Sequence, residues 1–126
     1  MSAPAALVVE DDNLMASVLK ALLTKQGWEV DIAPDGQSGL QRLVDRPDHW
    51  GLAVVDLFLP HLSGLDLIRQ VRARPELADT PIIVLSASAQ EGDVVTALEI
   101  GANDFLTKPL RPSEFLARLK RVRRPA

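Results

Sequence analysis

Five short apolar segments, each followed by a stretch in which apolar residues recur at helical spacing, most constrain how this chain folds. The segments predict strands at residues 5–9, 28–33, 52–55, 82–85 and 105–107. The stretches that follow them, such as the one from Leu14 to Leu23, predict five amphipathic helices. Parallel strands need crossover connections of this kind and become buried on both faces. The pattern predicts an α/β fold, a doubly wound five-stranded parallel sheet with five helices in a three-layer α/β/α sandwich.

Length and composition limit the class of protein. A chain of 126 residues, 47% of them hydrophobic, fits one compact domain. We therefore expect one domain over residues 1–126, with its core at about 5–122 and a frayed basic tail at 123–126. No apolar run approaches the ~18 residues that a membrane span needs, and residues 1–6 lack the pattern of a signal peptide. We expect a cytoplasmic protein with no membrane partner.

Cysteine is absent from the chain, and only two histidines are present. The absence of cysteine excludes disulfides, iron–sulfur clusters, cysteine nucleophiles and thiolate-rich metal sites. Two histidines also argue against zinc.

The net charge of −3 conceals an uneven distribution of charge. The segment from Lys108 to the end holds seven basic residues and one acid, whereas seven basic residues and 16 acids precede it. An acidic body favours a cation as partner, and a basic end favours a linker or a polyanion contact. The position of each charge in the fold must decide between these functions.

Polar groups capable of chemistry follow four of the five predicted strands. Glu10 and Asp11 follow the first strand, Asp56 the third, Ser86 the fourth and Lys108 the fifth. In open α/β sheets, ligands bind beyond the carboxyl ends of the strands. Because all five strands point the same way, we expect these side chains to meet at one edge of the sheet.

Three carboxylates at one edge need a counter-charge. Like charges at about 4 Å repel by about 4 kcal/mol at an effective dielectric near 20, and a divalent cation relieves this repulsion. Oxygen ligands without Cys or a His pair favour Mg2+, or else Mn2+, and Mg2+ usually keeps several waters and binds a phosphate oxygen. Lys108 and the Ser86 hydroxyl suit phosphate oxygens. The edge therefore predicts phosphoryl transfer to a carboxylate nucleophile.

Four short motifs coincide with these strand ends. They are VVEDD at residues 8–12, VVDLFLPHLSG at 54–64, VLSA at 84–87 and GANDFLTKPL at 101–110. In this order they resemble the receiver domain of two-component response regulators, and the resemblance covers roughly residues 5–122. It implies a CheY-like, flavodoxin-like fold with strand order 2-1-3-4-5, and a cis peptide bond between Lys108 and Pro109.

The resemblance implies a role for each carboxylate. Asp56 would be the phosphoacceptor, receiving its phosphoryl group from a sensor histidine kinase or a histidine phosphotransfer protein in a magnesium-dependent reaction. Asp11 and Asp56 would bind Mg2+ together with the backbone carbonyl of Phe58, and Glu10 would act through a bound water. Asp12 would remain an acid at the start of a helix.

The resemblance also implies a switch. Lys108 would bridge Asp56 or its phosphoryl group. Ser86 would move toward the phosphate and Phe105 would turn inward, and these rearrangements would change the partner-binding face. The protein would be a phosphorylation-controlled signalling switch that self-dephosphorylates rather than an enzyme. Phe105 stands where tyrosine is more usual and has no hydroxyl to donate. Phe58 is bulky and apolar, and we hypothesise that it hinders the water that attacks the acyl phosphate.

The basic end has two interpretations. Cations at a helix C-terminus stabilise the helix by about 0.3 to 1 kcal/mol each when exposed. Alternatively, Asp104 and Arg118, with Asn103 and Arg121 nearby, resemble half of the charged pairing by which receivers of winged-helix transcription factors dimerise. The other half is incomplete, because Val94 stands where a base would meet Glu114. A homodimer through the face formed by the fourth and fifth helices is therefore a hypothesis.

The sequence pattern can also be compared with other functions of an α/β domain. The same receiver could be part of a larger DNA-binding transcriptional regulator or a hybrid kinase, with a fused output domain, or could act through a separate effector protein without contacting nucleic acid itself. An aspartyl-nucleophile phosphatase would need a second acid two residues after Asp56, where Phe58 stands. A flavin-binding electron carrier would need a phosphate loop rich in hydroxyls and amides after the first strand, where acids stand instead.

Overall fold

The computed structural model describes residues 3–87 and 90–122, and the predicted tail at 123–126 lies outside the described residues. Five parallel strands form one sheet in the order β2-β1-β3-β4-β5. The strands are β1 Ala5–Val9, β2 Glu29–Ala33, β3 Trp50–Val55, β4 Ile82–Ser86 and β5 Asp104–Thr107. The strand order places the carboxyl ends of β1 and β3 side by side, and it confirms the expected sheet.

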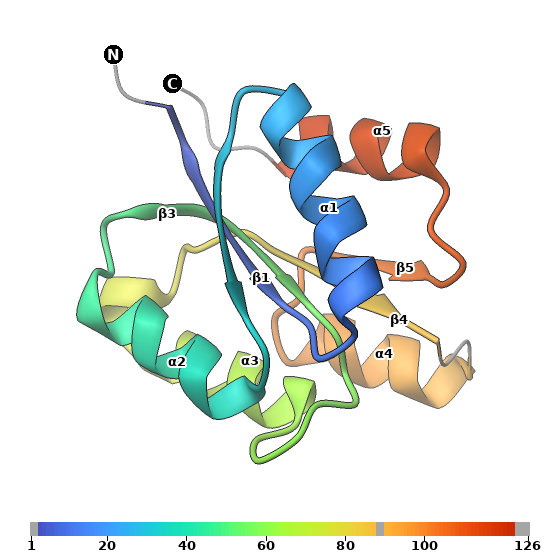
Figure 1. The fold of residues 1–126 in the computed structure, drawn as a ribbon. Helices are drawn as coiled ribbons and strands as arrows, with labels where there is room; N and C mark the ends of the chain where they lie inside the picture. The colour runs from blue at the N-terminus through green and yellow to red at the C-terminus, as the bar shows by residue number, and fades with distance from the viewer. Residues whose placement is uncertain (1–2, 88–89, 123–126) are drawn as a thin grey trace.

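Helices cover both faces of the sheet (Figure 1). The helices are α1 Asn13–Lys25, α2 Gly36–Asp45, α3 Gly64–Ala73, α4 Glu91–Glu99 and α5 Pro112–Val122. One face carries α1 and α5, and the other carries α2, α3 and α4. A short 3-10 helix, η1 Pro75–Leu77, precedes β4 and was not predicted from the sequence. The three-layer sandwich with five α-helices is therefore confirmed. Among the described residues, no helix has both the length and the apolarity to cross a bilayer.

Alternate residues of β1, an interior strand of the sheet, enter two separate cores. Leu7 and Val9 pack beneath α2, α3 and α4, whereas Ala6 and Val8 pack beneath α1 and α5. All four side chains have no exposed surface. Burying a Leu or Val side chain contributes about 1.5–3 kcal/mol. The wholly apolar sequence of β1 therefore fits a strand that is covered by helices on both faces, as the sequence predicted.

Strand boundaries differ slightly from the predicted ones. The second predicted strand started at Trp28, but β2 begins at Glu29, and the third begins two residues earlier than predicted, at Trp50. Both indoles are buried, with 4% and 3% of their surface exposed. The Trp50 indole N–H donates to the Arg42 carbonyl at 3.2 Å, so packing against α2 extends β3 beyond its β-branched run. These shifts lie at the amino ends of the strands, away from the edge that carries the polar groups.

Asp12 separates the acidic segment from α1. Its carboxylate accepts the N–H groups of Leu14 at 2.9 Å and Met15 at 3.3 Å, which are N–H groups that lack an intrahelical partner at the first turn of a helix. The interpretation of Asp12 as a helix-start acid is confirmed. Because this cap fixes where α1 begins, Glu10 and Asp11 remain on the link between β1 and α1.

Gly64 brings the start of α3 against the end of β3. Its N–H donates to the Leu57 carbonyl at 2.9 Å. A Cβ at this position would collide with the backbone carbonyl oxygen of Asp56. Only glycine permits this approach, so the VVDLFLPHLSG motif ends on the residue that fixes the backbone of its aspartate.

Candidate functional site

The predicted site residues lie where the sequence placed them, at the carboxyl edge of the sheet. The Glu10 N–H donates to the Ala33 carbonyl at 3.0 Å, and the Asp56 N–H donates to the Val9 carbonyl at 3.1 Å. The Lys108 N–H donates to the Ser86 carbonyl at 2.8 Å. Each bond continues a strand ladder by one residue. The backbone of the site is therefore as fixed as the sheet itself.

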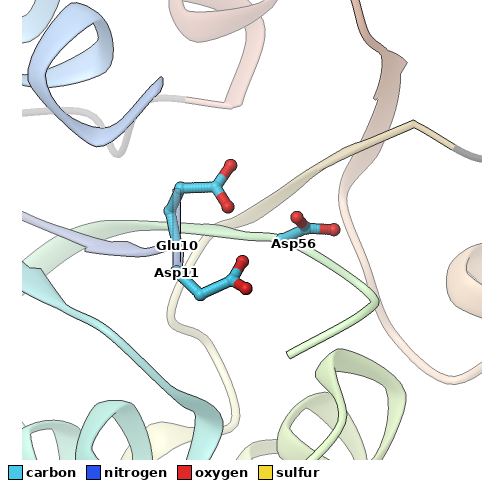
Figure 2. Close-up of side chains that lie close together, drawn as sticks. All are labelled: Glu10, Asp11 and Asp56. Atoms are coloured by element: carbon cyan, nitrogen blue, oxygen red, sulfur yellow. The ribbon is translucent and has the colours of Figure 1, made fainter. Parts of the chain in front are cut away.

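Three carboxylates from two strand ends face a common space (Figure 2). Glu10, Asp11 and Asp56 each offer one oxygen, and these oxygens lie within 4.8 Å of one another. Glu10 is 3% exposed and Asp56 is 8% exposed, whereas Asp11 lies at the surface. The acidic pocket formed by these three residues is therefore buried at Glu10 and Asp56 and open to solvent at Asp11.

Lys108 supplies the positive charge at the base of this pocket. Its ammonium lies 2.7 Å from Glu10 Oε1 and 3.1 Å from Asp56 Oδ2. The cis peptide bond between Lys108 and Pro109 is present, as expected. The contact with Asp56 matches the sequence-based expectation that the lysine faces this aspartate. The direct contact with Glu10 was not predicted, because the expectation gave Glu10 only a role through water.

Burial and pairing act on the two most enclosed charges. Burial raises the pKa of the Glu10 carboxyl above its ordinary value, and the neighbouring Asp56 adds to the increase, while the Lys108 hydrogen bond offsets part of it. Burial alone would lower the pKa of Lys108, but hydrogen bonds to Glu10 and Asp56 outweigh that effect and raise it. Lys108 is therefore a full cation at neutral pH.

The donor set fits a hard divalent cation. Three carboxylates against one ammonium leave an excess of negative charge, and Mg2+ is bound by one or two carboxylates together with waters and phosphate. No cysteine exists in the chain to favour a softer metal. Bound Mg2+ would neutralise charge on a transferring phosphoryl group. The acidic pocket is therefore compatible with Mg2+.

Ser86 and Phe105, the two predicted switch residues, lie on adjacent strands. Ser86 ends β4 and is fully buried. Phe105 lies in β5 opposite Val84 and packs, half-buried, against the core beneath α2, α3 and α4. Phe58 is 62% exposed, and its N–H donates to Asp56 Oδ1 at 3.2 Å. The Phe58 backbone is thus tied to the acceptor carboxylate, and its side chain is exposed rather than packed in a core.

The charged residues proposed for a dimer contact each other within one chain. Arg118 lies 3.3 Å from Asp104 Oδ2 and links α5 to β5. The Asn103 side-chain oxygen accepts the Ile82 N–H at 2.7 Å and an Arg72 N–H at 3.0 Å. Asn103 therefore binds inward, and Arg72 is a residue that sequence reasoning missed.

A doubly wound sheet in the order 2-1-3-4-5, with an acidic pocket and a lysine at its carboxyl edge, defines a CheY-like signalling fold. A family model, the response regulator receiver domain, matches residues 6–120. The chain therefore belongs to the response regulator receiver domain family and is a receiver domain of two-component signalling. Nothing in the site favours the phosphatase interpretation.

Curated relatives are longer proteins. The chain is 37% identical over 118 residues to the response regulator ArlR of Staphylococcus epidermidis, covering 94% of this chain and 52% of that protein. It is 39% identical over 120 residues to the transcriptional regulatory protein GltR of Pseudomonas aeruginosa, covering 95% of this chain and 49% of that protein. The chain thus spans about half the length of the curated relatives it matches.

Solved structures agree on the fold. A putative response regulator from Chloroflexus aurantiacus is 31% identical with a TM-score of 0.88, covering 97% of this chain and 98% of the other. A receiver domain of a signal transduction histidine kinase from Syntrophus aciditrophicus is 31% identical with a TM-score of 0.85, covering 95% of this chain and 89% of the other. Similar receivers thus occur in both regulators and kinases.

Proposed function

We propose that Asp56 is the phosphoacceptor of this receiver. The observation that carries the proposal is the contact of Lys108 with Asp56 Oδ2 at 3.1 Å, inside a pocket that also holds Glu10 and Asp11. A buried carboxylate can act as the nucleophile toward phosphorus. After transfer, the nearby ammonium of Lys108 stabilises the negative charge on the phosphoryl oxygens of the acyl phosphate. The phosphodonor is the phosphohistidine of a sensor histidine kinase or of a histidine phosphotransfer protein.

The transfer exchanges one bond for another. An Asp56 carboxylate oxygen attacks phosphorus, the new P–O bond forms, and the P–N bond to the donor imidazole breaks. The imidazole nitrogen leaves with the electron pair of the P–N bond and takes up a proton from solvent. Reversal of the signal is hydrolysis, in which water attacks phosphorus, the acyl P–O bond breaks, and Asp56 is restored with release of inorganic phosphate. The domain self-dephosphorylates in this way but acts as a signalling domain rather than as an enzyme.

Magnesium is the proposed cofactor. Asp11 and Asp56 would hold it with the backbone carbonyl of Phe58, and Glu10 would contribute through a water. When bound, Mg2+ offsets charge on the transferring phosphoryl oxygens. The residues of the chain supply the remainder: the Lys108 ammonium would offset charge on the phosphoryl oxygens, and Glu10 holds Lys108 in place at 2.7 Å.

Phosphorylation is proposed to shift an equilibrium between two states of the switch. Ser86 and Phe105 would rearrange in the phosphorylated state, and the face made by α4, β5 and α5 would change with them. Support comes from the sheet, where Ser86 pairs with Thr107 next to Lys108 and Val84 pairs with Phe105. Two residues along each strand, from Ser86 to Val84 and from Thr107 to Phe105, therefore separate the strand ends proposed to contact the phosphate from the half-buried ring.

The output is proposed to be carried by other protein contacts. The chain covers about half the length of GltR, a relative named as a transcriptional regulatory protein, so a DNA-binding effector domain is one expected partner, and a hybrid kinase or a separate effector protein is another. Residues 1–126 would form one cytoplasmic receiver domain that makes no contact of its own with nucleic acid or membrane.

A homodimer through α4 and α5 is a second proposal. Light scattering with and without a phosphate mimic tests it, and a monomer in both states contradicts it.

The phosphoacceptor is tested by intact mass after incubation with acetyl phosphate or phosphoramidate and Mg2+. We expect one phosphoryl adduct on Asp56 that needs Mg2+ and disappears in Asp56→Asn. The matched control is Asp66→Asn, which removes an exposed aspartate in the first turn of α3 and leaves the adduct intact. Because some receivers accept small donors poorly, a phosphorylated histidine phosphotransfer protein is the second donor. No adduct from either donor, or an adduct that survives Asp56→Asn, overturns the proposal.

A further inference from the structure

The amino ends of β4 and β5, opposite the acidic pocket, are joined by one arginine. Arg72 lies near the end of α3, and its guanidinium donates to backbone carbonyls of two separate segments. The acceptors are Thr80 at 2.7 Å, Ala78 at 3.0 Å and Gly101 at 2.9 Å. One side chain thus connects α3, the segment before β4 and Gly101, which lies two residues beyond the end of α4.

Asn103, the residue immediately before β5, completes this connection. Its side-chain oxygen accepts an Arg72 N–H at 3.0 Å and the Ile82 N–H at 2.7 Å, and its own N–H donates to the Ile82 carbonyl at 2.8 Å. A planar guanidinium presents its donors in a rigid fork, so these bonds fix the direction as well as the distance of each partner. Lysine cannot reproduce that arrangement.

The backbone is shaped around the arginine. Gly101 adopts a φ of 124°, which side chains other than hydrogen rarely allow. A Cβ at Gly101 would lie 2.6 Å from Arg72 Cγ and 2.8 Å from Arg72 Nε. The glycine therefore serves two purposes, the turn after α4 and the room for Arg72, and the connection between α4 and β5 is tightly fixed.

The helix that this connection ends is itself weakly buried. In α4 only Ala97 is fully buried, and Val95 and Leu98 are each 44% exposed. Two residues beyond Asn103 stands Phe105, which is only half-buried. Elements with little buried apolar surface are those that move at low cost in free energy. The rigid point at Gly101 therefore lies between two elements that can move.

We propose that Arg72 is a positioning residue of the switch, which holds Gly101 and Asn103 fixed so that α4 and Phe105 rearrange about that point. This inference rests on the proposed phosphorylation switch. Without the arginine, the segment between α4 and β5 moves together with α4. Phosphorylation at the distant acidic pocket then no longer produces one defined new arrangement of the face made by α4, β5 and α5. Arg72 touches neither the acceptor nor its ligands, so its effect reaches the pocket only through the sheet and α4.

The test compares Arg72→Lys and Asn103→Ala with Arg69→Lys, a matched control one helical turn earlier in α3 whose side chain is exposed. First, amide hydrogen exchange is measured without ligand. We expect exchange at residues 101–105 to rise roughly tenfold relative to β1 in both test variants and not in the control. Unchanged exchange in both test variants overturns the inference, whatever the pocket does.

Second, beryllofluoride and Mg2+ are added as a phosphoryl mimic, and amide chemical shifts are followed by NMR. In the test variants we expect the amide chemical-shift change at residues 91–105 to fall to less than about half of the wild-type change. Affinity for Mg2+ alone should stay within about twofold of wild type, because the pocket is at the other end of the strands. A full wild-type response in both variants contradicts the proposal, as does a parallel loss of Mg2+ affinity, which marks a general loss of structure. If wild-type protein gives no response to beryllofluoride, the proposed function fails instead, and the positioning role falls with it.

Discussion

The ammonium of Lys108 lies closer to Glu10 than to Asp56, at 2.7 Å against 3.1 Å. Glu10 and Asp56 come from the ends of two neighbouring strands and are both buried. Lys108 therefore neutralises two carboxylates at once, and it is held in place by the one that is not proposed to react. The resting pocket is stabilised by this shared cation, and removal of the cation has a measurable cost.

Lys108→Met is expected to lower the free energy of unfolding by about 3 kcal/mol without Mg2+, because loss of one partner leaves buried charge uncompensated. Magnesium should restore more stability to this variant than to wild type, since it enters a pocket with a larger negative charge. Urea denaturation with and without Mg2+ measures both quantities. Lys20→Met, on the exposed side of α1, is the control and should change stability by less than about 0.5 kcal/mol. Equal metal-free stabilities of Lys108→Met and wild type would contradict the role of the shared cation.

Asp11→Asn should act in the opposite direction. Asp11 is exposed at the rim, and its oxygen is within 4.8 Å of those of Glu10 and Asp56. Removing one of three like charges is expected to raise metal-free stability by about 1 kcal/mol, which is well below the unscreened repulsion because water and salt reach the rim. The same variant should lose most of the stabilisation by Mg2+. Asp12→Asn keeps the helix cap and is the control; an undiminished Mg2+ effect in Asp11→Asn would rule Asp11 out as a ligand.

Phe58→Asn is expected to speed hydrolysis of the phosphorylated domain by about tenfold, or about 1.4 kcal/mol in barrier height. The exposed ring of Phe58 stands two residues from Asp56 and its N–H is bonded to the Asp56 carboxylate, so it is placed to obstruct an attacking water. Decay of the adduct, followed by mass after removal of the donor, measures the rate. Phe58→Leu keeps an apolar side chain and should decay close to the wild-type rate. Equal or slower decay in Phe58→Asn refutes the hypothesis.

The strands and their reactive ends could be predicted because burial on two faces leaves an uninterrupted apolar run, and the first polar residue after it marks the edge of the sheet. Glu10, Asp56 and Ser86 were found in this way. Strand order was not contained in the spacing of the residues. It followed from the resemblance of four motifs to one family, and the structure confirms it.

Two features of the structure could not be predicted for a physical reason. The direct contact of Glu10 with Lys108 joins residues 98 positions apart, and no local pattern selects which carboxylate a lysine will approach. Arg72 stands in a stretch with Arg69 and Arg74 that looks like a solvated helix end. Its acceptors are mainly backbone carbonyls, which every residue carries, so the sequence distinguishes it from its neighbours only through Gly101 and Asn103.

His61→Gly is expected to stabilise the domain by about 1 kcal/mol. His61 lies at the surface with a φ of 70°. The Leu62 N–H donates to the Pro60 carbonyl at 2.8 Å, which makes His61 the central residue of a three-residue turn. Residues with a side chain adopt this positive φ only with strain. Glycine adopts this conformation without the strain, and the exposed imidazole takes little packing with it. His61→Ala keeps the strain and is the control. Chemical denaturation that ranks alanine equal to glycine would show that the backbone conformation carries no cost.

Asp35 should give stability a dependence on pH in the acid range. It caps α2 by accepting the Ser38 N–H at 2.7 Å, and this backbone hydrogen bond lowers the pKa of the carboxyl below its ordinary value of 3.8. A group whose pKa is lower in the folded state binds protons more weakly there than in the unfolded chain. Its stabilisation is therefore complete above pH 3.8 and is lost as the pH falls through the lower, folded value.

Asp35→Asn separates the charge from the cap, because an amide oxygen still accepts the Ser38 N–H. We expect this variant to lose less stability on acidification below pH 3.8 than wild type does, and to remain more stable at neutral pH than Asp35→Ala, which has no acceptor. Thermal unfolding between pH 2 and 7 measures both comparisons. Asp45→Asn, which removes an exposed aspartate at the other end of α2, is the matched control for loss of a carboxylate on the same helix. The first residue of α2, Gly36, lies so close to the Leu62 carbonyl that a Cβ there would collide with it. Loss of the Asp35 cap is therefore also expected to weaken the packing of α2 against the loop that follows Asp56. An Asp35→Asn variant with the full wild-type acid slope would show that this carboxylate contributes nothing to that dependence.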